Sequence, residues 1–129
     1  MAVNESRKVL VVDDCEDNLL LMELLLQSEG YTVKSANSGW KGLAAIKSQR
    51  PDLIILDLMM PDISGLEVIQ HLKSKCQISN IPVILLTANI DLKLKDAKDI
   101  DALCYKPFEI GSILDIVQSL LMPSIMPQA

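Results

Sequence analysis

Aromatic residues, histidine and positive charge are all scarce in this chain. Only one Trp, two Tyr and one Phe occur in 129 residues, while half of the residues are hydrophobic, so we expect an aliphatic core. The sole histidine, His71, is expected on a solvated helix face. The formal net charge is -5. A nucleic-acid surface needs clustered Lys and Arg, so we expect no nucleic-acid partner, although this charge permits a cationic one.

Cysteine pairs and long apolar runs are also missing. Cys15, Cys76 and Cys104 form no C-x-x-C pair, and an odd number of cysteines is a poor basis for a disulfide framework. A reducing compartment is the simpler interpretation, and we expect a cytoplasmic location. The first ten residues contain no apolar stretch, and no run approaches the roughly 18 apolar residues of a membrane span. We therefore expect neither a signal peptide nor membrane insertion.

Short apolar runs alternate with longer helical patterns along the chain. Near-continuous aliphatic runs are typical of strands buried on both faces of a parallel sheet. The runs predict strands at 8–12, 31–36, 52–56 and 81–86, with a weaker one at 102–105. Helical patterns lie at about 17–28, 39–49, 65–75, 90–98 and 109–121. These units predict a doubly wound α/β domain over residues 1–121, followed by a tail or linker stub at 122–129.

Polar side chains follow four of the predicted strands. Asp13 and Asp14 follow the first strand, Asp57 the third, Thr87 the fourth and Lys106 the fifth. Parallel strands end at one edge of a sheet, and open α/β sheets bind their ligands at that edge. If the strand order is 2-1-3-4-5, the first and third strands are neighbours, and we expect their three carboxylates to converge.

Three carboxylates in one hollow repel one another unless their pKa values rise or a cation joins them. Carboxylate oxygens with room for water suit Mg²⁺, with Mn²⁺ as a substitute. A carboxylate can also be the nucleophile towards a phosphoryl group, and Asp57 has the position for that role. Lys106 would then supply positive charge to the transferred group and Thr87 a hydroxyl.

Each of these residues alone has an ordinary structural explanation. An Asp-Asp pair after a strand is commonly a loop or a helix cap. Thr87 can cap the next helix, and Lys106 can be a solvated lysine. The combination on four strand ends favours phosphoryl chemistry, because packing alone gives no reason for it.

Four stretches, VLVVDDCEDN, PDLIILDLMMPDISGLEVI, IPVILLTA and YKPF, resemble the response-regulator receiver domains of two-component signalling, of the chemotaxis-receiver type. The resemblance extends over about residues 7–121. It implies a flavodoxin-like, five-stranded parallel sheet in the order 2-1-3-4-5 with helices on both faces. It also implies a phosphoacceptor and not an enzyme with its own turnover. The phosphoryl donor would be a sensor histidine kinase or a histidine phosphotransfer protein.

The resemblance assigns roles to the residues near the first and third strands. Asp57 matches the phosphoacceptor, and Asp13 and Asp14 match the acidic pair that holds Mg²⁺. Met59 matches the residue whose backbone carbonyl joins these metal ligands. Its side chain cannot orient an attacking water by hydrogen bonds, although Asn89 is a second candidate for that task. We therefore expect slow unassisted loss of the phosphoryl group.

The fourth and fifth strands match the family less closely. Thr87 matches the switch hydroxyl and Lys106 the lysine that pairs with the phosphoryl group, with a cis bond to Pro107. Only 19 positions separate Thr87 from Lys106, about three fewer than usual, which predicts a segment shorter by about one helical turn. The family has an aromatic residue where this chain has Leu103. Tyr105 lies on the same strand face and is the candidate replacement, with a core tyrosine as the alternative.

The first predicted helix is apolar almost all round. Seven of the eight residues from Leu19 to Leu26 are hydrophobic. If Leu21, Met22 and Leu25 face the sheet, Leu19 and Leu26 lie nearer solvent. An exposed apolar surface of this kind favours a site for a partner protein over lateral packing.

We therefore predict a stand-alone receiver that is phosphorylated on Asp57 and then changes its binding to a partner. Two alternatives stay open. The first is a small phosphatase with an aspartyl nucleophile, but the D-x-D pattern of such enzymes is missing, since Leu58 and Met59 follow Asp57. The second is a degenerate receiver that acts as a phosphorylation-independent binding module. The intact acids and lysine count against it, while the shortened fourth helix counts for it.

Overall fold

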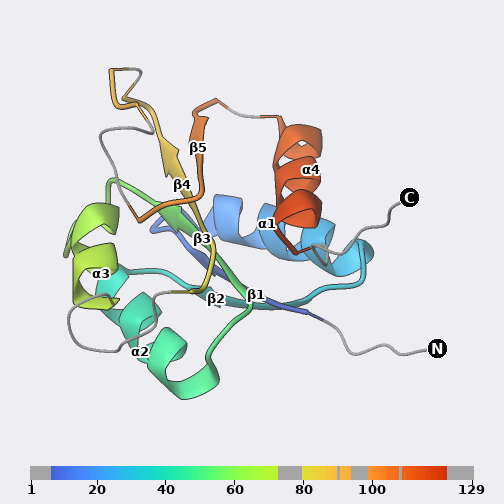
Figure 1. Ribbon diagram of the computed structural model, residues 1–129, viewed down its shortest axis with the longest axis horizontal. Helices are drawn as coiled ribbons and strands as arrows, with labels where there is room; N and C mark the ends of the chain where they lie inside the picture. The colour runs from blue at the N-terminus through green and yellow to red at the C-terminus, as the bar shows by residue number, and fades with distance from the viewer. Residues whose placement is uncertain (1–6, 73–79, 90, 94–98, 108, 122–129) are drawn as a thin grey trace.

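A computed structural model describes residues 7–72, 80–89, 91–93, 99–107 and 109–121. Five parallel strands form one sheet in the order β2-β1-β3-β4-β5 (Figure 1), which confirms the predicted fold class and strand order. The strands are β1 (Lys8–Val12), β2 (Thr32–Ala36), β3 (Leu53–Asp57), β4 (Val83–Thr87) and β5 (Ala102–Tyr105). The helices of the described residues are α1 (Glu16–Ser28), α2 (Gly39–Gln49), α3 (Gly65–His71) and α4 (Ile110–Leu121).

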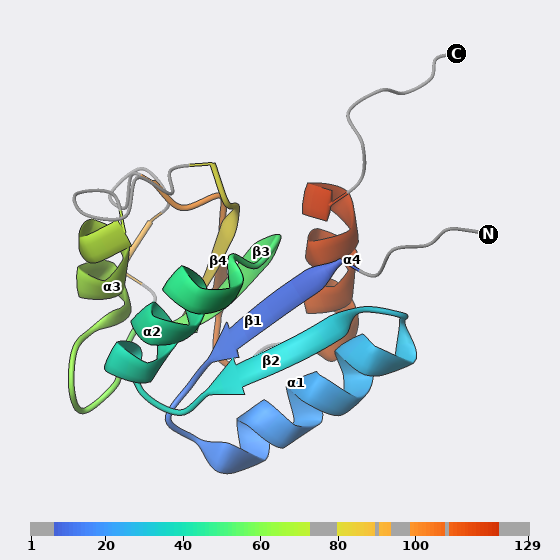
Figure 2. The same cartoon turned by 90° about the horizontal axis from the view of Figure 1, so that it is seen from below.

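The sheet is covered by helices on both faces, with α2 and α3 on one side and α1 and α4 on the other (Figure 2). Successive residues of a strand point to opposite faces. In β3, Ile54 joins the apolar cluster under α2 and α3, whereas Ile55 joins the cluster under α1 and α4. In β4, Leu85 joins the cluster under α2 and α3, and Ile84 joins the cluster under α1 and α4. Central strands with two buried faces explain why the sequence shows continuous aliphatic runs there.

The orientation of α1 differs from the prediction. The helix buries Leu19, Met22 and Leu26, so the prediction that placed Leu19 and Leu26 nearer solvent is wrong. Its exposed leucines are Leu20, Leu21 and Leu24. The three buried residues are three and four positions apart, so they lie on one face of the helix. Because seven of eight residues are apolar, hydrophobicity alone could not select this stripe, and the sheet beneath the helix decides it.

Element boundaries mostly agree with the predictions to within one or two residues. The largest shift at a strand is at β4, which was predicted at 81–86 and begins at Val83. Of the predicted helix at 90–98, residues 91–93 are not helical, and the rest lie outside the described residues. The end of the third predicted helix at 73–75, Cys76 and the tail at 122–129 also lie outside them. Among the residues that the structure describes, the helices are too short or too polar to cross a lipid bilayer.

The start of α3 is fixed tightly against the end of β3. A Cβ atom at Gly65 would lie 2.6 Å from the carbonyl oxygen of Asp57, so only glycine fits here. The Gly65 N–H donates to the carbonyl of Leu58 at 2.8 Å. Ser64 and Glu67 form a capping box, in which each side chain accepts the other residue's backbone N–H. These contacts hold the backbone of Asp57 in place from the side of α3.

Candidate functional site

Three carboxylates meet at the carboxyl edge of the sheet. Asp13 directly follows β1 and Asp57 ends β3, and these two strands are paired through Val12 and Leu56. One carboxylate oxygen from each of Asp13, Asp14 and Asp57 lies within 4.8 Å of the others. Asp13 and Asp57 are buried, whereas Asp14 is exposed. The site thus has two acids fixed in the protein and one that faces solvent.

Local hydrogen bonds hold the carboxylate of Asp13. One oxygen accepts the backbone N–H of Cys15 at 2.9 Å, and the other accepts the side-chain amide of Asn18 at 3.3 Å. The backbone N–H of Asp13 donates to the carbonyl of Ala36 at 3.1 Å, which continues the pairing of β1 with β2. The orientation of Asp13 is therefore set by the turn into α1 before any ligand binds.

Lys106 reaches the acidic cluster from the far side of β4. Its ammonium nitrogen lies 2.9 Å from a carboxylate oxygen of Asp57. The backbone N–H of Lys106 donates to the carbonyl of Thr87 at 2.7 Å, so the end of β5 stays paired with β4. The peptide bond from Lys106 to Pro107 is cis, as predicted. The structure thus brings together the acids of two strand ends and the lysine of a third.

The charges in this site depend on one another. Burial raises the pKa of Asp57, the hydrogen bond from Lys106 opposes this rise, and the nearby carboxylates of Asp13 and Asp14 add to it. Burial works against the charge of Lys106, but the hydrogen bond and attraction to Asp57 raise the pKa of its ammonium above the ordinary value. Three carboxylates therefore face one ammonium, and a cation would balance the excess negative charge.

Thr87 lies at the same edge, at the end of β4. Its side chain is buried, and its hydroxyl oxygen accepts the backbone N–H of Asn89 at 2.9 Å. The side-chain oxygen of Asn89 in turn accepts the N–H of Asp91 at 3.0 Å. The hydroxyl of Thr87 is thus joined to the turn that leaves β4.

Tyr105 lies beside Thr87, because these two residues are partners in the register of β4 and β5. Its side chain is exposed, so the alternative of a core tyrosine is wrong. The Tyr105 hydroxyl donates to the backbone carbonyl of Leu92, in the segment that follows β4. Leu103, by contrast, packs against the apolar cluster under α2 and α3. The tyrosine therefore connects β5 to the segment that Thr87 begins.

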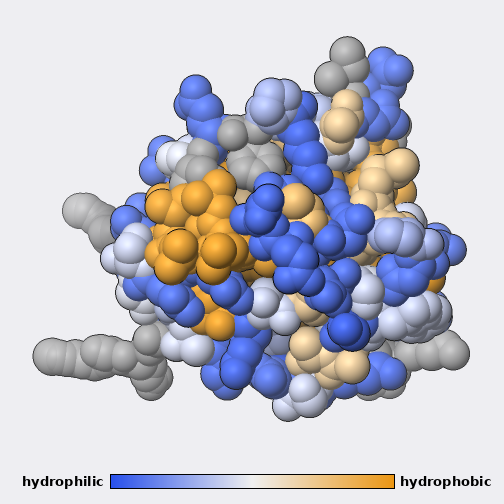
Figure 3. All heavy atoms as spheres, turned by 180° about the vertical axis from the view of Figure 1, so that it is seen from behind, coloured by the Kyte–Doolittle hydropathy of each residue, from blue (hydrophilic) through white to orange (hydrophobic). Residues whose placement is uncertain are grey.

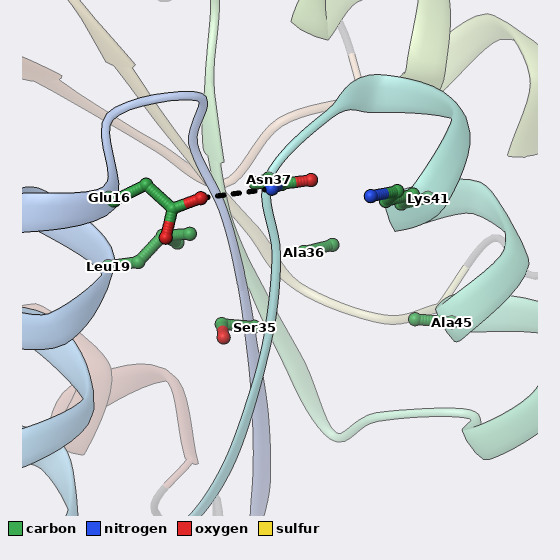
Figure 4. A pocket seen from close by; sticks show the side chains of 7 residues that line it. All are labelled: Glu16, Leu19, Ser35, Ala36, Asn37, Lys41 and Ala45. Carbon is green, nitrogen blue, oxygen red and sulfur yellow. Dashed lines mark hydrogen bonds between the residues drawn. The ribbon is translucent and has the colours of Figure 1, made fainter.

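A separate hollow of about 310 Å³ lies at the end of β2 (Figure 4). Glu16 and Leu19 of α1 line one side of it, and Lys41 and Ala45 of α2 line the other. The amide of Asn37 donates to Glu16 at 3.1 Å across its mouth. None of the predicted site residues lines this hollow, so it is separate from the carboxylate cluster.

The model of the response regulator receiver domain matches residues 9–118 of the chain. The chain belongs to the response-regulator receiver family. This receiver is 34% identical over 119 residues to sporulation initiation phosphotransferase F of Bacillus subtilis, covering 90% of this chain and 94% of that one. It is 36% identical over 116 residues to the probable transcriptional regulatory protein TcrX of Mycobacterium tuberculosis, covering 88% of this chain but only 49% of TcrX.

Solved structures agree with this assignment. The chemotaxis response regulator CheY4 of Vibrio cholerae has a TM-score of 0.81 at 28% identity, covering 91% of this receiver and 100% of that chain. The response regulator TrrA of Thermotoga maritima, in complex with Mg²⁺ and BeF, has a TM-score of 0.80 at 34% identity, covering 89% and 99%. Receiver domains are generally phosphoacceptors without enzymatic turnover, and they bind Mg²⁺ at an acidic pocket.

The carboxylates of this receiver fit one such ion. Opposite ligands of an octahedral Mg²⁺ lie about 4 Å apart, so oxygens within 4.8 Å need only a small movement. Asp14 is exposed and can make that movement or bind through a water molecule. The side chain of Met59 is 70% exposed, so its thioether is not held at the carboxylate cluster. The carboxylates of Asp13, Asp14 and Asp57 offer oxygen ligands, which Mg²⁺ prefers.

Asp62, five residues after Asp57, was not predicted from the sequence to have a role. Its two carboxylate oxygens accept the backbone N–H groups of Gly39 at 3.1 Å and Trp40 at 2.9 Å. Burial opposes the ionisation of Asp62, but the hydrogen bonds from the backbone N–H groups of Trp40, Gly39 and Ile63 together outweigh it and lower the pKa of Asp62. The sequence Asp62-Ile63-Ser64 by itself indicates only a turn. The residues that Asp62 binds lie 22 and 23 positions earlier in the chain. No local pattern predicts such a contact.

Proposed function

We propose that this receiver accepts a phosphoryl group on Asp57 and that the modification changes its binding to a partner protein. The donor is the phosphohistidine of a sensor histidine kinase or a histidine phosphotransfer protein, and the reaction depends on Mg²⁺. The working unit is residues 1–121. The observation that carries this proposal is the 2.9 Å contact between Lys106 and Asp57, with Asp13 and Asp14 beside it.

Asp57 acts as the nucleophile. Its carboxylate oxygen forms a bond to phosphorus while the bond from phosphorus to the histidine nitrogen breaks, and that nitrogen keeps the electron pair. Although burial raises the pKa of Asp57, the hydrogen bond from Lys106 favours the ionised form that the reaction needs. Lys106 then pairs with an oxygen of the transferred group, and the hydroxyl of Thr87 donates to another.

The metal ligands in this proposal are the carboxylates of Asp13, Asp14 and Asp57 and the carbonyl of Met59. When bound, Mg²⁺ balances the negative charge that the carboxylates and the phosphoryl group bring together. Mn²⁺ is the proposed substitute, because it accepts the same oxygen ligands. The fixed position of Asp13 supports this arrangement, since its side chain loses less conformational freedom when the ion binds.

Loss of the phosphoryl group is slow in this proposal. Hydrolysis requires a water molecule oriented towards phosphorus, and the exposed thioether of Met59 is a poor group for that purpose. Asn89 is the other candidate, but its side-chain oxygen already accepts the N–H of Asp91. A long-lived phosphorylated form suits a signal that is passed on by binding.

The exposed leucines of α1 form the proposed docking surface for the phosphodonor. Hydrophobic side chains gather on the face where α1 lies (Figure 3). Leu20 and Leu24 are 56% and 57% exposed, and Leu21 lies beside them. The described helix carries acidic residues in its first turn and no basic residue in its last turn. A partner helix with apolar residues flanked by basic ones would complement this surface.

Incubation with acetyl phosphate and Mg²⁺, followed by intact mass spectrometry, tests the proposed function. We expect one added phosphoryl group on the wild type, and none on Asp57→Asn or when Mg²⁺ is chelated. A wild type that stays unmodified would instead favour the phosphorylation-independent binding module. Turnover of a generic phosphomonoester would favour the phosphatase alternative.

A further inference from the structure

The loop that follows the acceptor strand, residues 58–64, is fastened to the start of α2. Both oxygens of Asp62 are used, one by the N–H of Gly39 and the other by the N–H of Trp40. These are the first two residues of α2, and N–H groups in the first turn of a helix have no partner within the helix. A carboxylate also complements the positive end of the helix dipole. Asp62 thus binds α2 through two charge-assisted hydrogen bonds.

A close steric contact supports the same connection. A Cβ atom at Gly39 would lie 2.4 Å from a side-chain carbon of Ile63 and 3.2 Å from its carbonyl oxygen. The absence of a side chain at Gly39 lets Ile63 lie directly on the helix. Two adjacent residues of the 58–64 loop therefore contact the same turn of α2, one by hydrogen bonds and one by packing.

The two ends of the 58–64 loop are held in other ways. At its start, the N–H of Leu58 donates to the carbonyl of Leu86 at 2.8 Å. At its end, the capping box of Ser64 begins α3. Met59 lies between these ends, so the direction of its backbone carbonyl depends on the conformation of the middle of the loop. The two hydrogen bonds of Asp62 tie this middle part to α2.

We propose that Asp62 is a positioning residue that holds the 58–64 loop against α2 and thereby sets the affinity of the acidic site for Mg²⁺. It acts through Met59, whose carbonyl is a ligand in the proposed function, and the inference rests on that function. Asp62 is not one of the proposed metal ligands, because both of its oxygens accept backbone N–H groups of α2. Its removal frees the loop, so the carbonyl of Met59 must be ordered each time the ion binds.

Isothermal titration of the metal-free protein with Mg²⁺ tests this inference. We expect Asp62→Ala to raise the dissociation constant for Mg²⁺ by roughly tenfold. This is at the lower end of the losses in metal affinity seen when groups that support metal ligands are removed. Asp62→Asn keeps one acceptor oxygen and should lose less. Ser38→Ala is the matched control, because the Ser38 side chain caps the same helix by accepting the backbone N–H of Lys41 at 3.2 Å, a hydrogen bond local to the start of α2.

The single tryptophan gives a second readout that does not depend on phosphorylation. The backbone N–H of Trp40 donates to Asp62, so the tryptophan lies in the turn of α2 that the 58–64 loop contacts. Its emission should change as Mg²⁺ binding adjusts this loop, with the midpoint that calorimetry gives. In Asp62→Ala we expect this change to be lost. Gly39→Ala, which forces Ile63 away from the helix, should weaken Mg²⁺ binding as well and replaces Asp62→Ala if that variant does not fold.

The outcomes separate this inference from the proposed function. A wild-type dissociation constant in Asp62→Ala overturns the inference and leaves the proposed function intact. An equal loss in Ser38→Ala also overturns it, because the cause would then be the stability of α2. A wild type that binds no Mg²⁺ overturns both.

Discussion

The ammonium nitrogen of Lys106 lies 2.9 Å from a carboxylate oxygen of Asp57, and the carboxylate is almost completely buried. Removing one partner of such a pair leaves the other charge without compensation. We expect Lys106→Met to lower the free energy of unfolding by about 1–3 kcal/mol at neutral pH in the absence of metal. Urea unfolding in the presence of a chelator measures this loss.

The loss in Lys106→Met should depend on pH with a definite sign. The pKa of Asp57 is already raised by burial, and without the hydrogen bond from Lys106 it rises further. A carboxyl group whose pKa is raised in the folded protein adds to the free energy of unfolding at pH values below its unfolded pKa of about 4. This contribution is lost as pH rises through the folded pKa. The destabilisation should therefore be large near pH 7.5 and small near pH 4. An equal loss at both pH values would contradict this prediction.

The acidic cluster predicts stabilisation by Mg²⁺. At a concentration of about 100 times the dissociation constant, binding adds about 2.7 kcal/mol to the free energy of unfolding. We expect a rise in Tm of several degrees for the wild type and a much smaller rise for Asp14→Asn. Asp52→Asn is the control, since Asp52 accepts the Lys8 N–H at 2.8 Å at the opposite edge of the sheet. A loss of the Mg²⁺ effect in Asp52→Asn would argue against a local site.

Much of the candidate site follows from the sequence because strand ends are easy to recognise. Strands β3 and β4 are buried along their whole length, so their aliphatic runs stop where Asp57 and Thr87 begin the polar edge. In a parallel sheet all such ends lie at the same edge. The approach of Lys106 to Asp57 follows from this shared edge together with the strand order and the lysine role that the resemblance implies.

Other features depend on contacts between distant segments. The buried face of α1 could not be predicted, because Leu19 and Leu21 are equally hydrophobic and only the sheet selects between them. Asp62 is one acid in a turn, and its importance arises from the N–H groups of Gly39 and Trp40. Tyr105 was recognised as a strand residue, but its exposure could not be predicted, because β5 is an edge strand and its burial depends on distant segments.

The hydroxyl of Tyr105 joins β5 to the segment after β4 through the carbonyl of Leu92. Tyr105→Phe removes this hydrogen bond and keeps the ring. Because the site is exposed, we expect a loss of only about 0.5–1 kcal/mol in stability and faster amide hydrogen exchange at Leu92, whose N–H donates to Asn89. Tyr31→Phe, at the start of β2, should leave that exchange rate unchanged. Unaltered exchange in Tyr105→Phe would show that the hydroxyl does not hold this segment.

The exposed leucines of α1 allow docking to be separated from chemistry. We expect Leu20→Ser combined with Leu24→Ser to keep phosphorylation by acetyl phosphate and to reduce transfer from a phosphohistidine donor by roughly tenfold, as for loss of an apolar interface residue. Both side chains are more than half exposed, so stability should change by no more than about 0.5 kcal/mol per site. Leu26→Ala, at a completely buried position, should instead cost about 2–5 kcal/mol. Unchanged transfer in the double variant would exclude α1 as the docking surface.

Two glycines give opposite predictions for the same substitution. At Gly65 a Cβ atom would lie 2.6 Å from the carbonyl oxygen of Asp57, so the backbone of the acceptor residue must move. At Gly111, in α4, the Cβ atom would meet nothing within 4 Å. We expect Gly65→Ala to destabilise the protein by about 1–3 kcal/mol, as overpacking does, and to slow phosphorylation by acetyl phosphate. Gly111→Ala should stabilise it by about 0.4–1 kcal/mol, because alanine restricts the unfolded chain and favours the helix. Thermal unfolding measures both, and a neutral Gly65→Ala would mean that the end of β3 is not held against α3.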